Sequence, residues 1–258
     1  MTDTTSNLSL AEDEIHVWII NPQKITARTD IHALLCPLEQ EKVARHRLDK
    51  AKHTGLITRA FIRLLLSQYA PLGPKQWKFS VGKLGKPEVS NMPIPLRFNL
   101  SHNNERIICA LTLTKDIGCD IENLARKINV DAIAKRFFSA SEYQLIKENP
   151  SQFFEYWTLK EAFVKATGLG ISQGLETFSF EIHDAQDKSN HDNISLIFNE
   201  DCKETSPENW YHHLLFPDQQ HCIALSVNNK KQTDKKPTIR LFSEKETALL
   251  FLPALINH

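Results

Sequence analysis

The sequence predicts an α+β protein built from two α/β halves. Short apolar runs bounded by Gly, Pro and Asn predict strands in both halves of the chain. Between them lie segments whose apolar residues recur at helical spacing. The order is a strand, helices and strands, then helices and strands again, which predicts two α+β halves joined near residues 114–117.

The composition is typical of a globular chain without a large charge imbalance. Of 258 residues, 41% are hydrophobic and 24% are charged, and 31 basic residues balance 31 acidic ones. This balance creates no overall field that would recruit nucleic acid or an anionic membrane. The acidic first fourteen residues and the lack of a long apolar run predict a cytoplasmic protein without a secretory signal or membrane span. Five scattered cysteines without a CxxC disfavour disulfides and a zinc site.

The N-terminal half is expected over residues 15–115, after a flexible N-terminus at residues 1–14. Helical periodicity extends over residues 38–69, with a break expected near residues 49–55, where Gly55 lies. This region is also basic, which is usual for a solvated helix face. Strands are expected in four short runs, at residues 15–20, 78–81, 96–100 and 106–113.

The C-terminal half is expected over residues 116–227, followed by a linker and tail of unknown role at residues 228–258. Ser139 and Glu142 have the spacing of a capping box that opens a helix. Residues 184–208 are polar and predict a surface excursion. The remaining elements are strands at residues 116–122 and 177–182, a helix at 130–137, a hairpin pairing 211–216 with 222–227, and a tail helix at 243–252.

A central helix of about four turns is predicted over the sixteen residues between Ser151, its N-cap, and Gly168, at its C-terminal end. One face is apolar and predicts core: Leu159, Ala162, Phe163 and Ala166. A second stripe recurs every four residues: Phe153, Trp157, Glu161 and Lys165. An isolated Glu161–Lys165 pair would be an ordinary exposed ion pair, so its meaning depends on the residues upstream.

Asp120 and Glu122 alternate along a predicted strand, which places both carboxylates on one face, ~7 Å apart. An isolated pair of this kind usually faces solvent. Here the neighbours Ile117 and Ile121 are apolar, and the central helix offers Glu161 as a third carboxylate. Three carboxylates with positions left open for water and phosphate oxygens suit Mg²⁺.

Two further segments could contact an anion. Ser101 and His102 are adjacent in a predicted strand, so they point to opposite faces and cannot act as nucleophile and base on one another, although each can donate to an anion. The segment GKLGKP at residues 82–87 lacks the glycine spacing of a phosphate loop and predicts only a turn that presents Lys86.

Five sequence blocks, in this order and spacing, resemble the 4′-phosphopantetheinyl transferase superfamily, in its large, monomeric, surfactin-synthetase-activating type. They are GKP at 85–87, NLSHN at 99–103, GCDIE at 118–122, RFFSASEY at 136–143 and WTLKEAFVKATGLG at 157–170. The resemblance covers residues 15–227. It implies a pseudo-dimeric fold of two similar halves and transfer of the phosphopantetheine arm of coenzyme A to a serine of an acyl, peptidyl or aryl carrier protein, with release of 3′,5′-ADP.

The resemblance also implies roles for individual residues. The ligands of Mg²⁺, or of Mn²⁺ in its place, would be Asp120, Glu122 and Glu161. Lys165 would meet the charge that develops during transfer, and Glu161, or Glu142 through a water, would take the proton of the carrier serine. Coenzyme A would be held by Lys86, Ser101 and His102, with His102 near its 3′-phosphate. The resemblance also implies cations for the 3′-phosphate in the first helical region. Lys42 matches one such position, and His53 or Arg59 would replace an arginine that is expected near Thr54 and is absent.

Two other readings compete with this one. A non-catalytic protein that binds coenzyme A or a carrier protein would share the fold, but it would not need the complete set of carboxylates with Lys165. A nucleic-acid-binding protein would explain the basic helices, but the neutral total charge and the absence of RNA-binding motifs argue against it.

Overall fold

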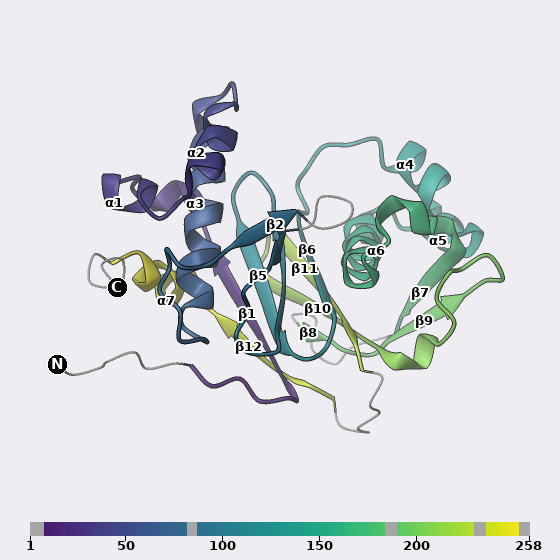
Figure 1. Ribbon diagram of the computed structural model, residues 1–258. Helices are drawn as coiled ribbons and strands as arrows, with labels where there is room; N and C mark the ends of the chain where they lie inside the picture. The colour runs from purple at the N-terminus through teal and green to yellow at the C-terminus, as the bar shows by residue number, and fades with distance from the viewer. Residues whose placement is uncertain (1–7, 82–86, 184–189, 230–235, 253–258) are drawn as a thin grey trace. The chain divides into compact units, whose positions relative to one another are not determined.

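The computed structural model describes residues 8–81, 87–183, 190–229 and 236–252. They form a mixed α+β protein, as predicted (Figure 1). The chain divides into two compact units, one comprising Met1–Leu96, Asn104–Thr114 and Thr238–His258, the other Arg97–Asn103 and Lys115–Pro237. This division differs from the expected halves in two places. Residues 97–103 belong to the second unit, and the chain returns to the first unit after residue 237.

The first unit contains a sheet in which β1 (Glu14–Ile20) lies between two neighbours. It pairs antiparallel with β5 (Ile107–Leu113) and parallel with β12 (Thr238–Phe242). All of β1 after its first residue is buried, as expected of a central strand. The other elements of this unit are α1 (Thr29–His32), α2 (Pro37–Ala44), α3 (Asp49–Leu66), β2 (Phe79–Val81), β3 (Pro87–Val89) and α7 (Glu244–Ala248).

The break expected near residues 49–55 is wrong, because α3 is continuous from Asp49 to Leu66 and includes Gly55. The two helices are instead separated at residues 45–48. A glycine inside a helix costs only ~1 kcal/mol relative to alanine, which is small beside the burial of several large apolar side chains. In α3 these include Leu56, Ile57, Phe61 and Leu64.

The C-terminal tail contains a strand that the sequence analysis missed. In β12, Phe242 stacks on Trp18 of β1, with ring centroids 3.7 Å apart. The helix expected at residues 243–252 is shorter, ending at Ala248, and a 3₁₀ turn follows (Leu249–Phe251). Glu244 forms ion pairs with Lys24, at 2.9 Å, and with Arg106, at 2.8 Å. The tail is therefore an integral part of the first unit.

The second unit contains a four-stranded sheet in the order β6-β11-β10-β8 and a separate two-stranded sheet of β7 and β9. The predicted hairpin is present as β10 and β11. The prediction of a surface excursion at residues 184–208 is wrong in part, because the strand β9 lies within this segment and pairs antiparallel with β7. Residues 184–189 lie outside the described part of the chain. The strands are β4 (Leu96–His102, of which all but Leu96 belong here), β6 (Ile117–Asn123), β7 (Phe178–Ile182), β8 (Asn190–His191), β9 (Ile194–Phe198), β10 (Trp210–Asp218) and β11 (His221–Asn228).

Three helices complete this unit, namely α4 (Val130–Phe137), α5 (Ala140–Glu148) and α6 (Phe153–Thr167). The capping box of Ser139 and Glu142 is present at the start of α5. At the end of α6, Gly168 adopts the left-handed conformation, with a φ of 71°. The prediction that Ser151 caps α6 is wrong. The Ser151 hydroxyl group donates to Asn149 instead, and a 3₁₀ turn precedes the helix.

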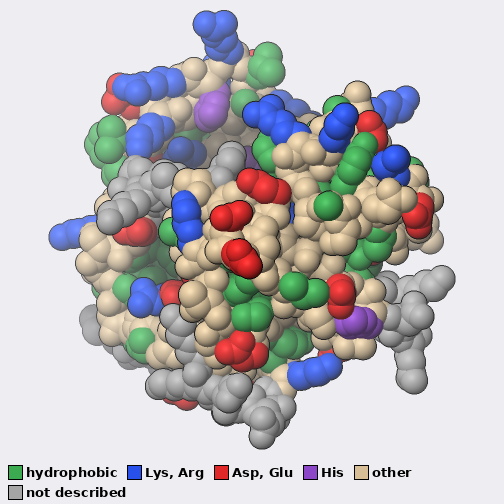
Figure 2. Space-filling view, turned by 90° about the vertical axis from the view of Figure 1, so that its right-hand side faces the viewer, with side chains coloured by type: hydrophobic (Ala, Val, Ile, Leu, Met, Phe, Trp, Pro, Cys, Tyr) green, Lys and Arg blue, Asp and Glu red, His purple; other side chains and the backbone are tan. Residues whose placement is uncertain are grey.

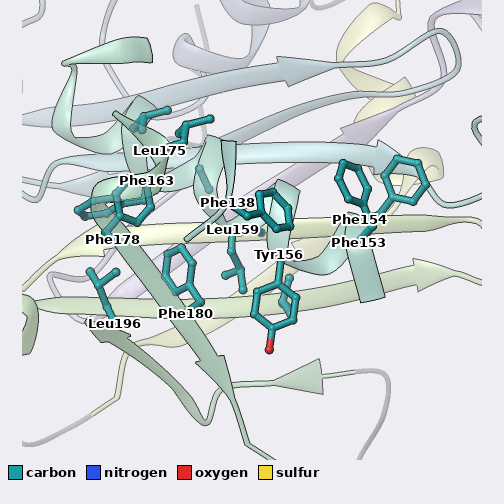
Figure 3. Packing of buried hydrophobic residues seen from close by; sticks show 14 of the residues in the cluster. Phe138, Phe153, Phe154, Tyr156, Leu159, Phe163, Leu175, Phe178, Phe180 and Leu196 are labelled. Atoms are coloured by element: carbon teal, nitrogen blue, oxygen red, sulfur yellow. The ribbon is translucent and has the colours of Figure 1, made fainter. Parts of the chain in front are cut away.

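The central helix α6 packs against β6 and β11, and its predicted apolar face lies in the core. Phe163 is fully buried and packs against Phe178 (Figure 3), with ring centroids 4.8 Å apart. The ring centroid of Trp210 lies 4.9 Å from that of Phe163. Among the described residues, no helix is long and apolar enough to cross a membrane.

Candidate active site

The site is built where β6 approaches α6 at Gly118. A Cβ atom at this position would lie 2.0 Å from the carbonyl oxygen of Ala162 and 2.5 Å from the amide nitrogen of Ala166. Only glycine therefore allows the two backbones to come this close. Asp120 follows two residues later on β6 and meets Lys165 of α6.

Asp120 uses its two carboxylate oxygens differently. Oδ1 accepts hydrogen bonds from Lys165 Nζ and from Ser101 Oγ, each at 2.6 Å. Oδ2 is buried and has no hydrogen-bond partner in the described part of the chain. Buried polar atoms are nearly always partnered, because leaving one without a partner is costly. The free oxygen therefore marks a place where a ligand can bind.

Glu122 and Glu161 add two further carboxylates. The pKa of Glu122 is raised to about 7, first by burial and then by the charge of Asp120, although Arg126, at 3.2 Å, and Lys165 act to lower it. Burial also raises the pKa of Glu161, with a second contribution from Asp120, while Lys165 lowers it. Asp120 thus lies close enough to both glutamates to disfavour their ionisation, as expected where a cation is to bind.

Lys165 compensates part of this negative charge. Burial by itself would lower the pKa of its ammonium group, but the charge and hydrogen bond of Asp120 outweigh that effect, so the pKa is raised. The ammonium group also donates to Ser101 Oγ, at 3.0 Å. Its side chain remains 29% exposed, so it can still reach a ligand.

The expected three-carboxylate metal site is not preformed. No group of three His, Cys, Asp or Glu side chains among the described residues is arranged to hold a metal ion, and Lys165 occupies one oxygen of Asp120. The donor chemistry nevertheless fits a hard divalent cation, because the ligands are carboxylates, one buried oxygen lacks a hydrogen-bond partner, and burial together with the charge of Asp120 raises the pKa of both Glu122 and Glu161.

Glu142, expected as a possible base, is a buried group with both oxygens occupied. Oε2 lies 2.8 Å from Lys160 Nζ and accepts from Ser139, while Oε1 accepts from the Phe180 amide. Lys160 is fully buried and also donates to the carbonyl oxygens of Leu175 and Phe178. These contacts tie α5 and α6 to the segment that leads into β7.

The sequence analysis assigned no role to Lys160, although its position carries a signal. It lies four residues after Tyr156 and three before Phe163, which are both buried, so helical spacing places it on the buried face of α6. Trp157 packs among aromatic rings, stacking on Phe153 and Phe138, and its side chain forms a hydrogen bond with Glu122.

The residues expected to contact coenzyme A are placed in different parts of the molecule. Ser101 is buried and His102 is exposed, as their alternation predicts. Lys42, on α2, and Arg59, on α3, belong to the first unit, where Arg59 donates to the carbonyl oxygen of Gly55. Lys86 lies outside the described residues.

Comparison with known proteins identifies the family. Residues 116–226 match the family model of the 4′-phosphopantetheinyl transferase superfamily. The chain is 35% identical over 175 residues to the 4′-phosphopantetheinyl transferase HetI of Nostoc sp., an alignment that covers 65% of this chain and 74% of the relative. It is 34% identical over 156 residues to the 4′-phosphopantetheinyl transferase Sfp of Bacillus subtilis, covering 58% of this chain and 68% of the relative. A second 4′-phosphopantetheinyl transferase of Bacillus subtilis is 36% identical over 173 residues, covering 65% and 75%. The chain belongs to the 4′-phosphopantetheinyl transferase superfamily.

Proposed function

We propose that this chain transfers the 4′-phosphopantetheine arm of coenzyme A to a serine of an apo acyl, peptidyl or aryl carrier protein, releasing 3′,5′-ADP, and that it acts as a monomer. The observation that carries the proposal is the meeting of Asp120 and Lys165 at the contact of β6 with α6, with Glu122 and Glu161 within electrostatic reach. Three carboxylates beside an ammonium group suit phosphoryl transfer, which depends mainly on positioning and charge stabilisation.

Asp120, Glu122 and Glu161 are the residues that would hold Mg²⁺, or Mn²⁺ in its place. Asp120 offers Oδ2, since Oδ1 is taken by Ser101 and Lys165. When bound, the ion neutralises negative charge on the diphosphate of coenzyme A and makes its phosphorus a better electrophile.

In the reaction, the hydroxyl oxygen of the carrier serine forms a bond to the phosphorus that bears the pantetheine arm. The bond from this phosphorus to the oxygen it shares with the second phosphate breaks, and that phosphate leaves as part of 3′,5′-ADP. Lys165, held in place by Asp120, stabilises the charge that develops on the phosphates.

Glu161 is the residue that we assign to accept the serine proton. It lies one helical turn before Lys165 on α6 and within electrostatic reach of both Lys165 and Asp120. Glu142 is the less suitable acceptor, because Ser139, Lys160 and the Phe180 amide already occupy its oxygens.

The phosphates of coenzyme A would be contacted by cationic and imidazole side chains. We assign Lys86 and His102 to this role, with His102 near the 3′-phosphate, and Lys42 and Arg59 as further cations for that phosphate. The exposure of His102 supports its availability for such a contact.

The test is to incubate the protein with coenzyme A, MgCl₂ and an apo carrier protein and to measure the intact mass of the carrier. We expect the mass to increase by one phosphopantetheine group, and the increase to disappear with a chelator or in Glu161→Gln. The alternative is a non-catalytic protein that binds coenzyme A or a carrier. Tight binding of coenzyme A without modification of any acyl, peptidyl or aryl carrier tested would favour that alternative.

A further inference from the structure

Ser101 lies between the two charged residues at the centre of the site. Its hydroxyl group donates to Asp120 Oδ1, at 2.6 Å, and accepts from Lys165 Nζ, at 3.0 Å. The residue is 7% exposed, and it belongs to the same unit as both partners. Three side chains from β4, β6 and α6 thus form one closed hydrogen-bonded group.

The chemistry of the partners determines which of them receives the hydroxyl proton. A carboxylate can only accept a hydrogen bond, and an ammonium group can only donate one. Ser101 must therefore give its single proton to Asp120 and offer a lone pair to Lys165. Because a phosphate oxygen needs a donor, Ser101 has no proton left for a phosphate of coenzyme A in this arrangement.

We propose that Ser101 is a positioning residue for Asp120 and Lys165, and that it does not bind a phosphate of coenzyme A directly. By occupying Oδ1 together with Lys165, it fixes the orientation in which Oδ2 of Asp120 remains without a partner. It also holds the Lys165 ammonium beside the carboxylate. This inference rests on the proposed function for its catalytic consequence, although the contacts exist independently of it.

A second contact of the same strand supports this role. Asn99, two residues before Ser101, accepts a hydrogen bond from the Cys119 amide through Oδ1, at 2.9 Å. Its own carbonyl oxygen accepts from Cys119 Sγ, at 3.2 Å. Asn99 and Ser101, which alternate along β4 and are both buried, therefore bond to Cys119 and Asp120, which are consecutive in β6. More than one hydrogen bond thus sets the position of Ser101 relative to Asp120.

The kinetic test compares Ser101→Ala with Ser101→Thr, which keeps the hydroxyl group, using coenzyme A and dephospho-coenzyme A. We expect Ser101→Ala to lower kcat by about tenfold or more with both substrates, with less than a threefold change in KM, because the lost contact organises the reacting groups. Ser101→Thr should recover most of the loss. A higher KM for coenzyme A that disappears with dephospho-coenzyme A would assign Ser101 to the 3′-phosphate and overturn the inference.

Ser226→Ala is the matched control, because Ser226 is also buried, lies on the neighbouring strand β11, and bonds to His212 instead of to the site. It should lower stability without the same loss of kcat. An equal loss of kcat in both serine variants would show a general structural effect and contradict the positioning role.

A double-mutant cycle, measured by the midpoints of chemical denaturation, tests the contact between Ser101 and Asp120 without relying on activity. If Ser101 acts on Asp120, the midpoint shift of the Ser101→Ala, Asp120→Asn double variant should differ from the sum of the single shifts. Additive shifts would overturn the inference even in an active enzyme. If the wild type modifies no carrier but the cycle is non-additive, then the proposed function fails and the contact itself stands.

Discussion

Asp120 accepts two hydrogen bonds on one oxygen and none on the other. The pKa values of Glu122 and Glu161 are raised first by burial and then by the charge of Asp120. Lys165 acts to lower both pKa values but does not cancel these effects. Residues of this kind reduce stability in the absence of their ligand, as is common at functional sites.

The first prediction concerns the pH dependence of the metal-free protein. The pKa of Glu122 is raised from an ordinary value of 4.5 to about 7, so the folded state holds a proton that the unfolded state has released. The contribution of Glu122 to stability is therefore fully present below pH 4.5 and is lost as pH rises through about 7. Thermal melts between pH 4.5 and 8 should show this decline in wild type and a smaller one in Glu122→Gln. Identical slopes in the two proteins would contradict it.

The second prediction separates structure from catalysis at Glu142. The Glu142–Lys160 pair is 2% and 0% exposed, so removal of either partner leaves a buried charge uncompensated. Glu142→Gln and Lys160→Met should each lose ~3–5 kcal/mol of unfolding free energy. The folded fraction of Glu142→Gln should keep a kcat near that of wild type.

Glu41→Gln is the control for this comparison. It breaks the exposed Arg45–Glu41 pair, at 70% and 58% exposure, and should cost ~0–1 kcal/mol. A Glu142→Gln variant as stable as wild type but unable to transfer would identify Glu142 as the base after all.

At the scale of elements, α6 has one face in the core and one stripe at the site. Phe163 lies among Phe178, Trp210 and other rings of the core, whereas Lys165 lies against Asp120. Two residues of separation turn the helix by ~200°, so neighbouring positions serve different purposes.

The third prediction uses this difference. Phe163→Ala should lose ~3–5 kcal/mol of stability, because it removes a large, fully buried side chain. Lys165→Ala should fold and bind coenzyme A measurably but transfer slowly, since its ammonium acts mainly on charge that develops in the transition state. Chemical denaturation and carrier modification should be measured side by side. A stable, inactive Phe163→Ala beside an unfolded Lys165→Ala would reverse the assignment of the two faces.

At the scale of the whole molecule, the first and the last described strands lie in the same unit. Strand β12 pairs with β1 across more than two hundred residues of sequence, and Phe242 lies on Trp18. The closing of such a long loop costs conformational entropy, so the contacts that close it must be favourable.

The fourth prediction follows from adjacent residues of β12. Phe242 is 3% exposed and Leu241 is 38% exposed. Phe242→Ala should lose ~3–5 kcal/mol, and Leu241→Ala, the matched control, much less. The measurement is the midpoint of urea denaturation. Equal midpoints for the two variants would show that the tail contributes little to the first unit.

The fifth prediction concerns the charge of the whole chain. Basic and acidic residues are equal in number, and both kinds occur on the face shown in Figure 2. We expect no appreciable affinity for oligonucleotides at 150 mM salt, measured by fluorescence anisotropy with an apo carrier protein as the comparison. Tight oligonucleotide binding that weakens steeply between 50 and 200 mM salt would indicate a phosphate-binding surface and contradict this expectation.

The sequence by itself determined features that depend on a few neighbouring residues. The capping box of Ser139 and Glu142, the end of α6 at Gly168 and the opposite exposure of Ser101 and His102 follow from bonds and periodicities within one or two turns. The pairing of Asp120 with Glu122 on one strand is of the same kind. Such features depend on residues that are close in sequence, so they can be predicted without knowledge of the tertiary structure.

Only the tertiary structure decided which surfaces meet. The pairing of β12 with β1 joins the two ends of the first unit's fold. The pairing of β9 with β7 and the ion pair of Glu142 with Lys160 likewise join different elements of the second unit. The contact of Ser101 with Asp120 likewise spans two strands. These contacts depend on packing and on the compensation of buried charge, which no local pattern encodes. A carboxylate that resembles a catalytic base in sequence can therefore be a structural ion pair once its buried partner is in place.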